Sequence, residues 1–111
     1  MSRRALPFVF LAGLLANPAL AVPLGDAAAG KEKSAPCAAC HGPQGNTSNA
    51  AFPKLAGQYA DYLLYSLKAY QSGSRQNPVM SGQVANLSEQ DMRDLAAYFA
   101  SQPGDLTVLE R

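Results

Sequence analysis

The chain has 111 residues, 48% of them hydrophobic and 15% charged, and a formal net charge of +1. That length is enough for one domain, and the composition is typical of a globular chain rather than a disordered one. Beyond residue 21, seven Lys and Arg stand against eight Asp and Glu. Because no basic excess remains there, nucleic acid is not an expected partner.

The first residues have the pattern of a secretory signal peptide. Arg3 and Arg4 precede an apolar run over residues 8–15, and the small residues Ala19 and Ala21 follow it. The run is too short to cross a bilayer of about 30 Å as a helix, although an uncleaved membrane anchor is the alternative. We therefore expect a signal peptide over residues 1–21 and an exported, periplasmic domain over residues 22–111 without a membrane span.

Three helices are expected in that domain, over residues 26–35, 58–71 and 88–101. Asp26 is a suitable N-cap for the first helix, and Pro36 should end it. The second helix has one apolar face, formed by Tyr59, Tyr62, Leu63, Leu67 and Tyr70. The third begins with a capping-box pattern and continues with an apolar stripe, formed by Met92, Leu95, Ala96 and Phe99.

The segments between these helices have the composition of loops. Residues 42–46 and 73–82 are rich in Gly, Pro, Asn and Ser, and no strand-like alternation occurs anywhere. The expected fold class is therefore all-α with long loops. Long loops in a compact domain usually have a function, and wrapping a cofactor is one such function.

The run Cys37-Ala38-Ala39-Cys40-His41 is the attachment signature for c-type haem. Two thiols at this spacing can add to the two vinyl groups of a porphyrin, and the next residue can then bind the iron. Three alternatives are a redox dithiol, a structural zinc site and a lone disulfide. The dithiol normally accompanies a βαβ pattern, zinc would lack a fourth ligand, and the two cysteines are too close in a helix for a disulfide.

His41 is the only histidine, so the second axial ligand of the iron must be something else. Met80 is the natural candidate, because it lies in an irregular stretch behind Pro78 and because Met/His ligation is known for cytochromes c. The alternative is that Met80 is a buried hydrophobe without a metal bond. Met92 lies on the apolar stripe of the last helix, where core packing is the better interpretation.

Four segments together resemble class I cytochromes c, in particular the bacterial cytochrome c4, c5 and c553 group. They are the C-x-x-C-H run, residues 52–58, the Met80 segment and residues 94–99. The resemblance covers about residues 26–102 and implies a small fold of three main helices with long loops around one covalent haem. Typical cytochromes c4 hold two such domains and two haems, whereas this chain has one C-x-x-C-H run.

The resemblance implies roles for further residues. Cys37 and Cys40 would form the thioethers, with His41 and Met80 as iron ligands. Residues that would line the haem pocket or shape its loops are Pro43, Pro53, Leu55, Tyr62, Leu63, Leu67 and Val79. Arg75 would pair with a haem propionate or, alternatively, be an ordinary surface charge. Gly30 would let the first helix cross the last one closely near Tyr98.

The expected function is that of a one-electron carrier rather than an enzyme. Its partners would be redox proteins, such as a quinol-oxidising complex, a terminal oxidase or reductase, or a dehydrogenase. One alternative is a haem-bearing subunit of a dehydrogenase or of a sulfur-oxidising complex. A more remote alternative is a ligand-binding or peroxidatic haem protein, which requires that Met80 does not bind iron.

Overall fold

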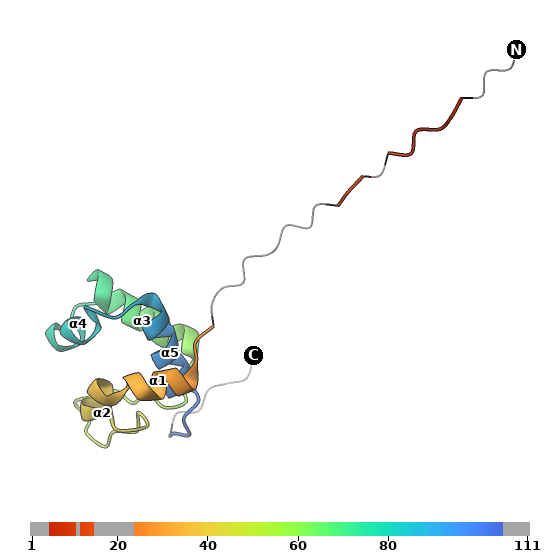
Figure 1. Ribbon diagram of the computed structural model, residues 1–111. Helices are drawn as coiled ribbons and strands as arrows, with labels where there is room; N and C mark the ends of the chain where they lie inside the picture. Colours follow the sequence, from red (N-terminus) through yellow and green to blue (C-terminus); the bar gives the residue numbers. More distant parts are fainter. Residues whose placement is uncertain (1–4, 11, 15–23, 106–111) are drawn as a thin grey trace, which may run out of the picture.

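The structure is a computed structural model that describes residues 5–10, 12–14 and 24–105. The described range from residue 24 onward contains five helices, in the order α1 (Ala27–Lys33), α2 (Ala35–His41), α3 (Ala60–Ser72), α4 (Pro78–Val84) and α5 (Glu89–Ala100) (Figure 1). The described residues contain no strand, and this confirms the expected all-α class.

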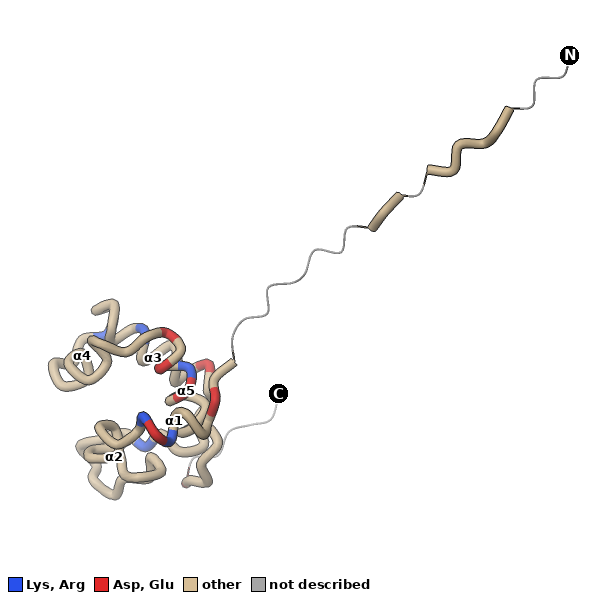
Figure 2. Tube along the Cα trace, viewed as in Figure 1, with Lys and Arg blue, Asp and Glu red and all other residues tan. Residues whose placement is uncertain are grey.

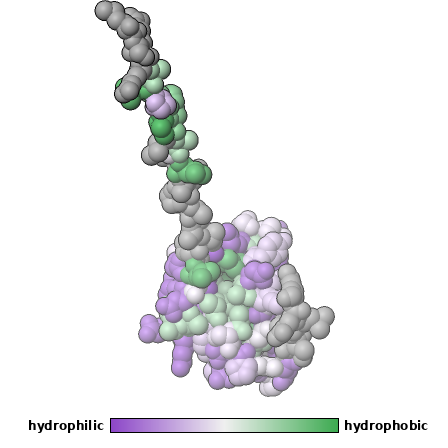
Figure 3. Space-filling model, turned by 90° about the vertical axis from the view of Figure 1, so that its right-hand side faces the viewer, coloured by the Kyte–Doolittle hydropathy of each residue, from purple (hydrophilic) through white to green (hydrophobic). Residues whose placement is uncertain are grey.

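The predicted signal peptide, residues 1–21, lies largely outside the described residues. Its described parts, residues 5–10 and 12–14, have no regular secondary structure and stand clear of the helical domain (Figure 3). Their large apolar side chains are at least 79% exposed, namely Leu6, Phe8, Val9, Phe10 and Leu14. In the part of the chain that the structure describes, no helix has the length and apolar character needed to span a membrane.

Helices α1 and α5 cross at a contact that has room only for glycine. A Cβ atom on Gly30 would lie 2.0 Å from the carbonyl oxygen of Asp94 and 2.8 Å from the Cβ of Tyr98. A Cβ on Gly25 would lie 2.1 Å from the carbonyl oxygen of Arg93. The structure thus confirms the close approach expected at Gly30, and Gly25 adds a second one.

A buried carboxylate holds this crossing together. The side chain of Asp94 is 4% exposed, and its Oδ2 accepts a hydrogen bond of 2.6 Å from Lys33 Nζ. Its Oδ1 accepts from the Asp26 backbone N–H at 2.8 Å and from Gln90 Nε2 at 2.8 Å. These donors, Lys33 first, lower the pKa of Asp94 to about 2. The ionised Asp94 carboxylate therefore connects α5 to both ends of α1, through the N-cap residue Asp26 and through Lys33.

The apolar core lies between α3 and α5. It consists of Leu63 from α3 and four residues of α5, namely Leu95, Ala96, Tyr98 and Phe99. Met92 is 2% exposed, in agreement with the core role expected for it. Helix α5 begins with the predicted capping box, because the Ser88 hydroxyl accepts from the Asp91 N–H while the Asp91 carboxylate accepts from the Ser88 N–H.

Two sequence predictions differ from the observed helices. The first expected helix is divided at Ser34, and Pro36 lies in the first turn of α2 rather than ending a helix. A proline is tolerated there because the first turn needs no N–H donor. The expected 73–82 loop contains α4 from residue 78, where Asn77 accepts from the backbone N–H groups of Val79 and Met80. Asn-Pro is a favourable N-cap and N1 pair, which the composition argument overlooked.

Candidate haem site

One cavity of about 370 Å³ lies between the helices, within the size range of cofactor sites in proteins. Helix α2 contributes Cys37, Cys40 and His41 to its lining, and α4 contributes Met80. Figure 1 shows α4 beside α3 in the upper half of the domain and α2 beside α1 in the lower half. The fold therefore brings the thiols and imidazole to one wall and the thioether to another.

All eleven residues that the sequence predicted for the site line this single cavity. They are Cys37, Cys40, His41, Pro53, Leu55, Tyr62, Leu63, Leu67, Arg75, Val79 and Met80. Two other residues of the sequence analysis, Pro43 and Gly30, do not line the cavity. The carbonyl of Pro43 accepts a hydrogen bond of 2.8 Å from the Tyr98 hydroxyl, and Gly30 lies at the α1–α5 crossing.

On the α2 wall, two thiols are available for covalent attachment of a cofactor and one imidazole is available to bind a metal. Both cysteines are free thiols with partly buried side chains, and burial raises the pKa of the Cys37 thiol. His41 is 7% exposed, and its Nδ1 lies 2.8 Å from the carbonyl oxygen of Pro53. Since a carbonyl can only accept, the hydrogen bond places a proton on Nδ1, and this tautomer leaves the Nε2 lone pair for a metal.

On the other wall, Met80 lies in the first turn of α4, whose N-terminus is capped by Asn77. The side chain of Asn77 accepts from the N–H of Val79 at 3.0 Å and from the N–H of Met80 at 3.1 Å. Gln71 of α3 donates to the carbonyls of Val84 and Leu87 at 2.9 and 2.7 Å, which ties the end of α4 to α3. Val79 is 59% exposed and lies at the rim of the cavity.

The charged side chains that line the cavity, among the described residues, are the cations Lys54 and Arg75. Arg75 donates to the Ser66 hydroxyl at 3.2 Å, and its guanidinium lies 4.7 Å from the centre of the Tyr70 ring. Lys54 forms an ion pair with Asp105. A largely apolar cavity with cations at its edge and no lining carboxylate fits a flat apolar macrocycle that carries two propionates.

Sequence reasoning missed several residues of the lining. Leu95, Ala96 and Phe99 belong to the predicted α5 stripe, and Tyr70 to the predicted α3 face, so their apolar periodicity could have suggested them. Lys54, Val84 and Leu87 carry no such signal. Lys54 and Leu87 reach the cavity from loops, and Val84 reaches it from the last turn of α4.

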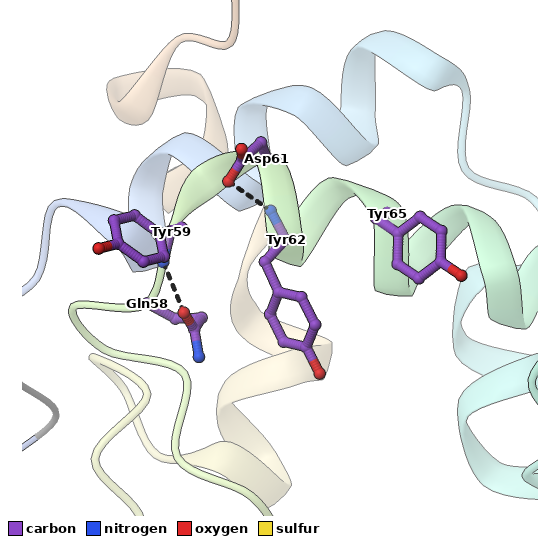
Figure 4. A pocket seen from close by; sticks show the side chains of 5 residues that line it. All are labelled: Gln58, Tyr59, Asp61, Tyr62 and Tyr65. Carbon is purple, nitrogen blue, oxygen red and sulfur yellow. Dashed lines mark hydrogen bonds between the residues drawn. The ribbon is translucent and has the colours of Figure 1, made fainter. Parts of the chain in front are cut away.

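A second, shallower pocket of about 410 Å³ adjoins the cavity at the start of α3. It is lined by Gln58, Tyr59, Asp61, Tyr62 and Tyr65, of which Gln58 and Tyr62 also line the cavity (Figure 4). The rings of Tyr62 and Tyr65 project from the same side of α3 (Figure 4) and are part of side chains that are 48% and 66% exposed. An aromatic surface therefore continues outward from the cavity along α3.

Comparisons with known proteins identify the family. The sequence pattern of the family described as Cytochrome c matches residues 27–103. Cytochrome c4 of Pseudomonas aeruginosa is 53% identical over 83 residues, which are 75% of this chain and 41% of that protein. Cytochrome c-554(548) of Halomonas halodenitrificans is 44% identical over 81 residues, which are 70% of this chain and 98% of that protein.

The chain is also similar to a solved structure and to an electron acceptor of a dehydrogenase. The reduced recombinant cytochrome c4 of Pseudomonas stutzeri superposes with a TM-score of 0.70 at 46% identity, over 74% of this chain and 48% of that one. A thiosulfate dehydrogenase electron acceptor of Stutzerimonas stutzeri is 43% identical over 68 residues, 59% of this chain and 32% of that protein. The chain thus spans about half or less of the length of the cytochromes c4 it matches.

A helical domain that encloses a C-x-x-C-H helix and faces it with a methionine is the architecture of a class I c-type cytochrome. This chain belongs to the cytochrome c family and falls within its c4 group. Its cofactor is covalently bound haem c.

Proposed function

We propose that the chain is a periplasmic one-electron carrier with a single haem. The observation that carries this proposal is the shared cavity, which receives two thiols and an imidazole from α2 and a thioether from α4. Haem in this cavity would supply an iron that alternates between Fe(II) and Fe(III). The match to cytochrome c-554(548) covers 98% of that protein and 70% of this chain, and it supports a carrier made of one such domain.

The residues of the chain would hold the macrocycle and set its environment. Cys37 and Cys40 would form the two thioethers, His41 would bind the iron through Nε2, and Met80 would bind it through sulfur. Because His41 and Met80 would both be bound to the iron, the site would be unsuited to binding a substrate. A soft thioether ligand and an apolar surrounding both favour Fe(II), and so raise the reduction potential.

Arg75 is the proposed partner of a haem propionate. It lines the cavity, and no Asp or Glu among the described residues forms an ion pair with it. The Tyr70 ring and the Ser66 hydroxyl hold the guanidinium at the edge of the cavity, so less side-chain entropy is lost when it binds a carboxylate.

Replacement of Met80 tests the central assignment. In holoprotein made in a host with cytochrome c maturation machinery, Met80→Ala should abolish the weak far-red band of sulfur bound to ferric iron. It should also allow the ferrous protein to bind carbon monoxide, because one axial position is then open. Met92→Leu is the matched control, since Met92 is buried outside the cavity and its replacement should leave the band in place. A far-red band that survives in Met80→Ala would contradict the ligand assignment.

The proposed partners are other redox proteins of the periplasm. A signal peptide over residues 1–21 would deliver the domain there, and N-terminal sequencing that returns Met1 from the purified protein would refute its cleavage. Similarity to a thiosulfate dehydrogenase electron acceptor supports a dehydrogenase as one electron donor. A quinol-oxidising complex and a terminal oxidase or reductase are the other candidates. Stable co-purification with a dehydrogenase would favour a permanent subunit over a mobile carrier.

A further inference from the structure

The bond between His41 and Pro53 depends on the position of the loop that carries Pro53. The loop joins α2 to α3, and its Leu55 and Ala56 N–H groups both bond to the carbonyl of Gly45, at 2.8 and 3.2 Å. Pro53 has no N–H and is itself exposed. The position of its carbonyl is therefore set by neighbouring residues and by whatever packs against the loop.

The segment that follows α5, residues 103–105, packs against this loop at three points. The carbonyl of Pro103 accepts a hydrogen bond of 2.7 Å from Asn46 Nδ2. Gly104 lies so close that a Cβ on it would be 2.8 Å from Ala56 Cβ and 2.8 Å from Asn46 Oδ1. Asp105 forms an ion pair with Lys54, the residue that follows Pro53. We call residues 103–105 the strap.

We propose that the strap positions the Pro53 carbonyl against His41 and thereby lowers the reduction potential of the haem iron. Asn46, Gly104 and Asp105 are positioning residues that act through Pro53 and touch neither the iron nor its ligands. A well-placed carbonyl at Nδ1–H increases the basicity of the imidazole, which stabilises Fe(III). Loosening the strap lengthens or misaligns this hydrogen bond and favours Fe(II).

The decisive variant is Asn46→Ala, which removes the bond to Pro103 without changing the charge. Redox titration of the holoprotein should show an increase in midpoint potential equivalent to about a threefold change in the reduction equilibrium, or about 28 mV at 59 mV per tenfold. Gly104→Ala should shift the potential in the same direction, because the added methyl group pushes against Ala56. The far-red band should persist in both variants, which separates this effect from loss of Met80.

Asp105→Asn also removes a negative charge, and this alone raises the potential. Glu89→Gln is its matched control, because Glu89 is an exposed carboxylate that forms ion pairs with Lys68 and Arg93 away from the loop. The shift in Asp105→Asn should exceed that in Glu89→Gln. An unchanged potential in both Asn46→Ala and Gly104→Ala, or equal shifts in the two charge variants, would overturn the proposal.

The inference rests on the proposed ligation by His41. A gel stained for haem and the wild-type spectrum test that ligation separately from the strap. Wild-type protein without covalent haem would therefore contradict the proposed function, whereas normal haem with an insensitive potential would contradict the strap alone.

Discussion

The α1–α5 crossing and the α3–α4 side of the haem cavity are built in opposite ways. Helix α5 buries six residues, including Asp94, and α1 approaches it without space for a methyl group. Helix α4 buries only Val84 and leaves Val79 59% exposed. The polypeptide completes the first region by itself, whereas the second needs apolar surface that a macrocycle can provide.

Charge is distributed along the same division. Asp and Glu gather around α1 and α5 (Figure 2). There, Lys33 Nζ lies 2.9 Å from an Asp91 carboxylate oxygen and 2.6 Å from an Asp94 carboxylate oxygen. The cavity side has Lys54 and Arg75 in its lining. Carboxylates thus stabilise the crossing from within the protein, while the cavity has cations suited to carboxylates brought by the cofactor.

The largest expected effect comes from preventing haem attachment. The double variant Cys37→Ser and Cys40→Ser should contain no covalent haem, and hydrogen exchange in α4 should accelerate roughly a hundredfold while α5 keeps much of its protection. Haem staining and amide exchange of the variant and the wild-type holoprotein measure both effects. Equal loss of protection in α4 and α5 would show that the two regions are not independently supported.

The next effect concerns the crossing. Gly30→Ala should destabilise the holoprotein by about 3 kcal/mol, because its methyl group would overlap the Asp94 carbonyl and the backbone would have to move. Denaturant unfolding provides the measurement. Gly82→Ala is the control within α4, where no atom lies within 4 Å of the added methyl group and a gain of about 0.5–1 kcal/mol is expected. A similar decrease in the free energy of unfolding in both variants would contradict the proposed difference in packing between the α1–α5 crossing and α4.

A smaller effect is expected for the carboxylate at the crossing. Asp94→Asn should cost about 2 kcal/mol at neutral pH, the usual value for hydrogen bonds to a charged group. Because the pKa of Asp94 is lowered to about 2, its contribution is complete above pH 3.8 and is lost as the pH falls toward 2. Urea unfolding between pH 7 and 2 should therefore show a weaker pH dependence in Asp94→Asn than in wild type. Glu32→Gln, on the exposed face of α1, should retain the wild-type dependence.

Local patterns in the sequence were sufficient for the helices that carry the core. The apolar periodicity of α3 and α5 and the capping box at Ser88 require only neighbours along the chain, and all three were predicted correctly. Helix α4 was missed because its seven residues show little apolar periodicity, although Asn77 and Pro78 were a usable start signal.

The cavity lining was predicted largely through family resemblance, and the contacts that support it were not. Lys33 and Asp94 are separated by 61 positions, Asn46 and Pro103 by 57. Pairings at such separations are set by the packed fold, which no local pattern encodes. The same holds for Gly25, whose close approach to Arg93 becomes visible only when α1 and α5 are placed together.

The cap on α4 also gives the proposed iron ligation a kinetic character. The Met80 N–H is one of the two amides that bond to Asn77, so a displacement of the Met80 backbone requires this cap to open. If release of the Met80 sulfur involves such a displacement, ligand exchange would be timed by a local unfolding event rather than by collision with the incoming molecule. The rate of ligand exchange should reach a plateau as the concentration of an added ligand such as imidazole rises. The rate at this plateau would measure how often the first turn of α4 unfolds locally.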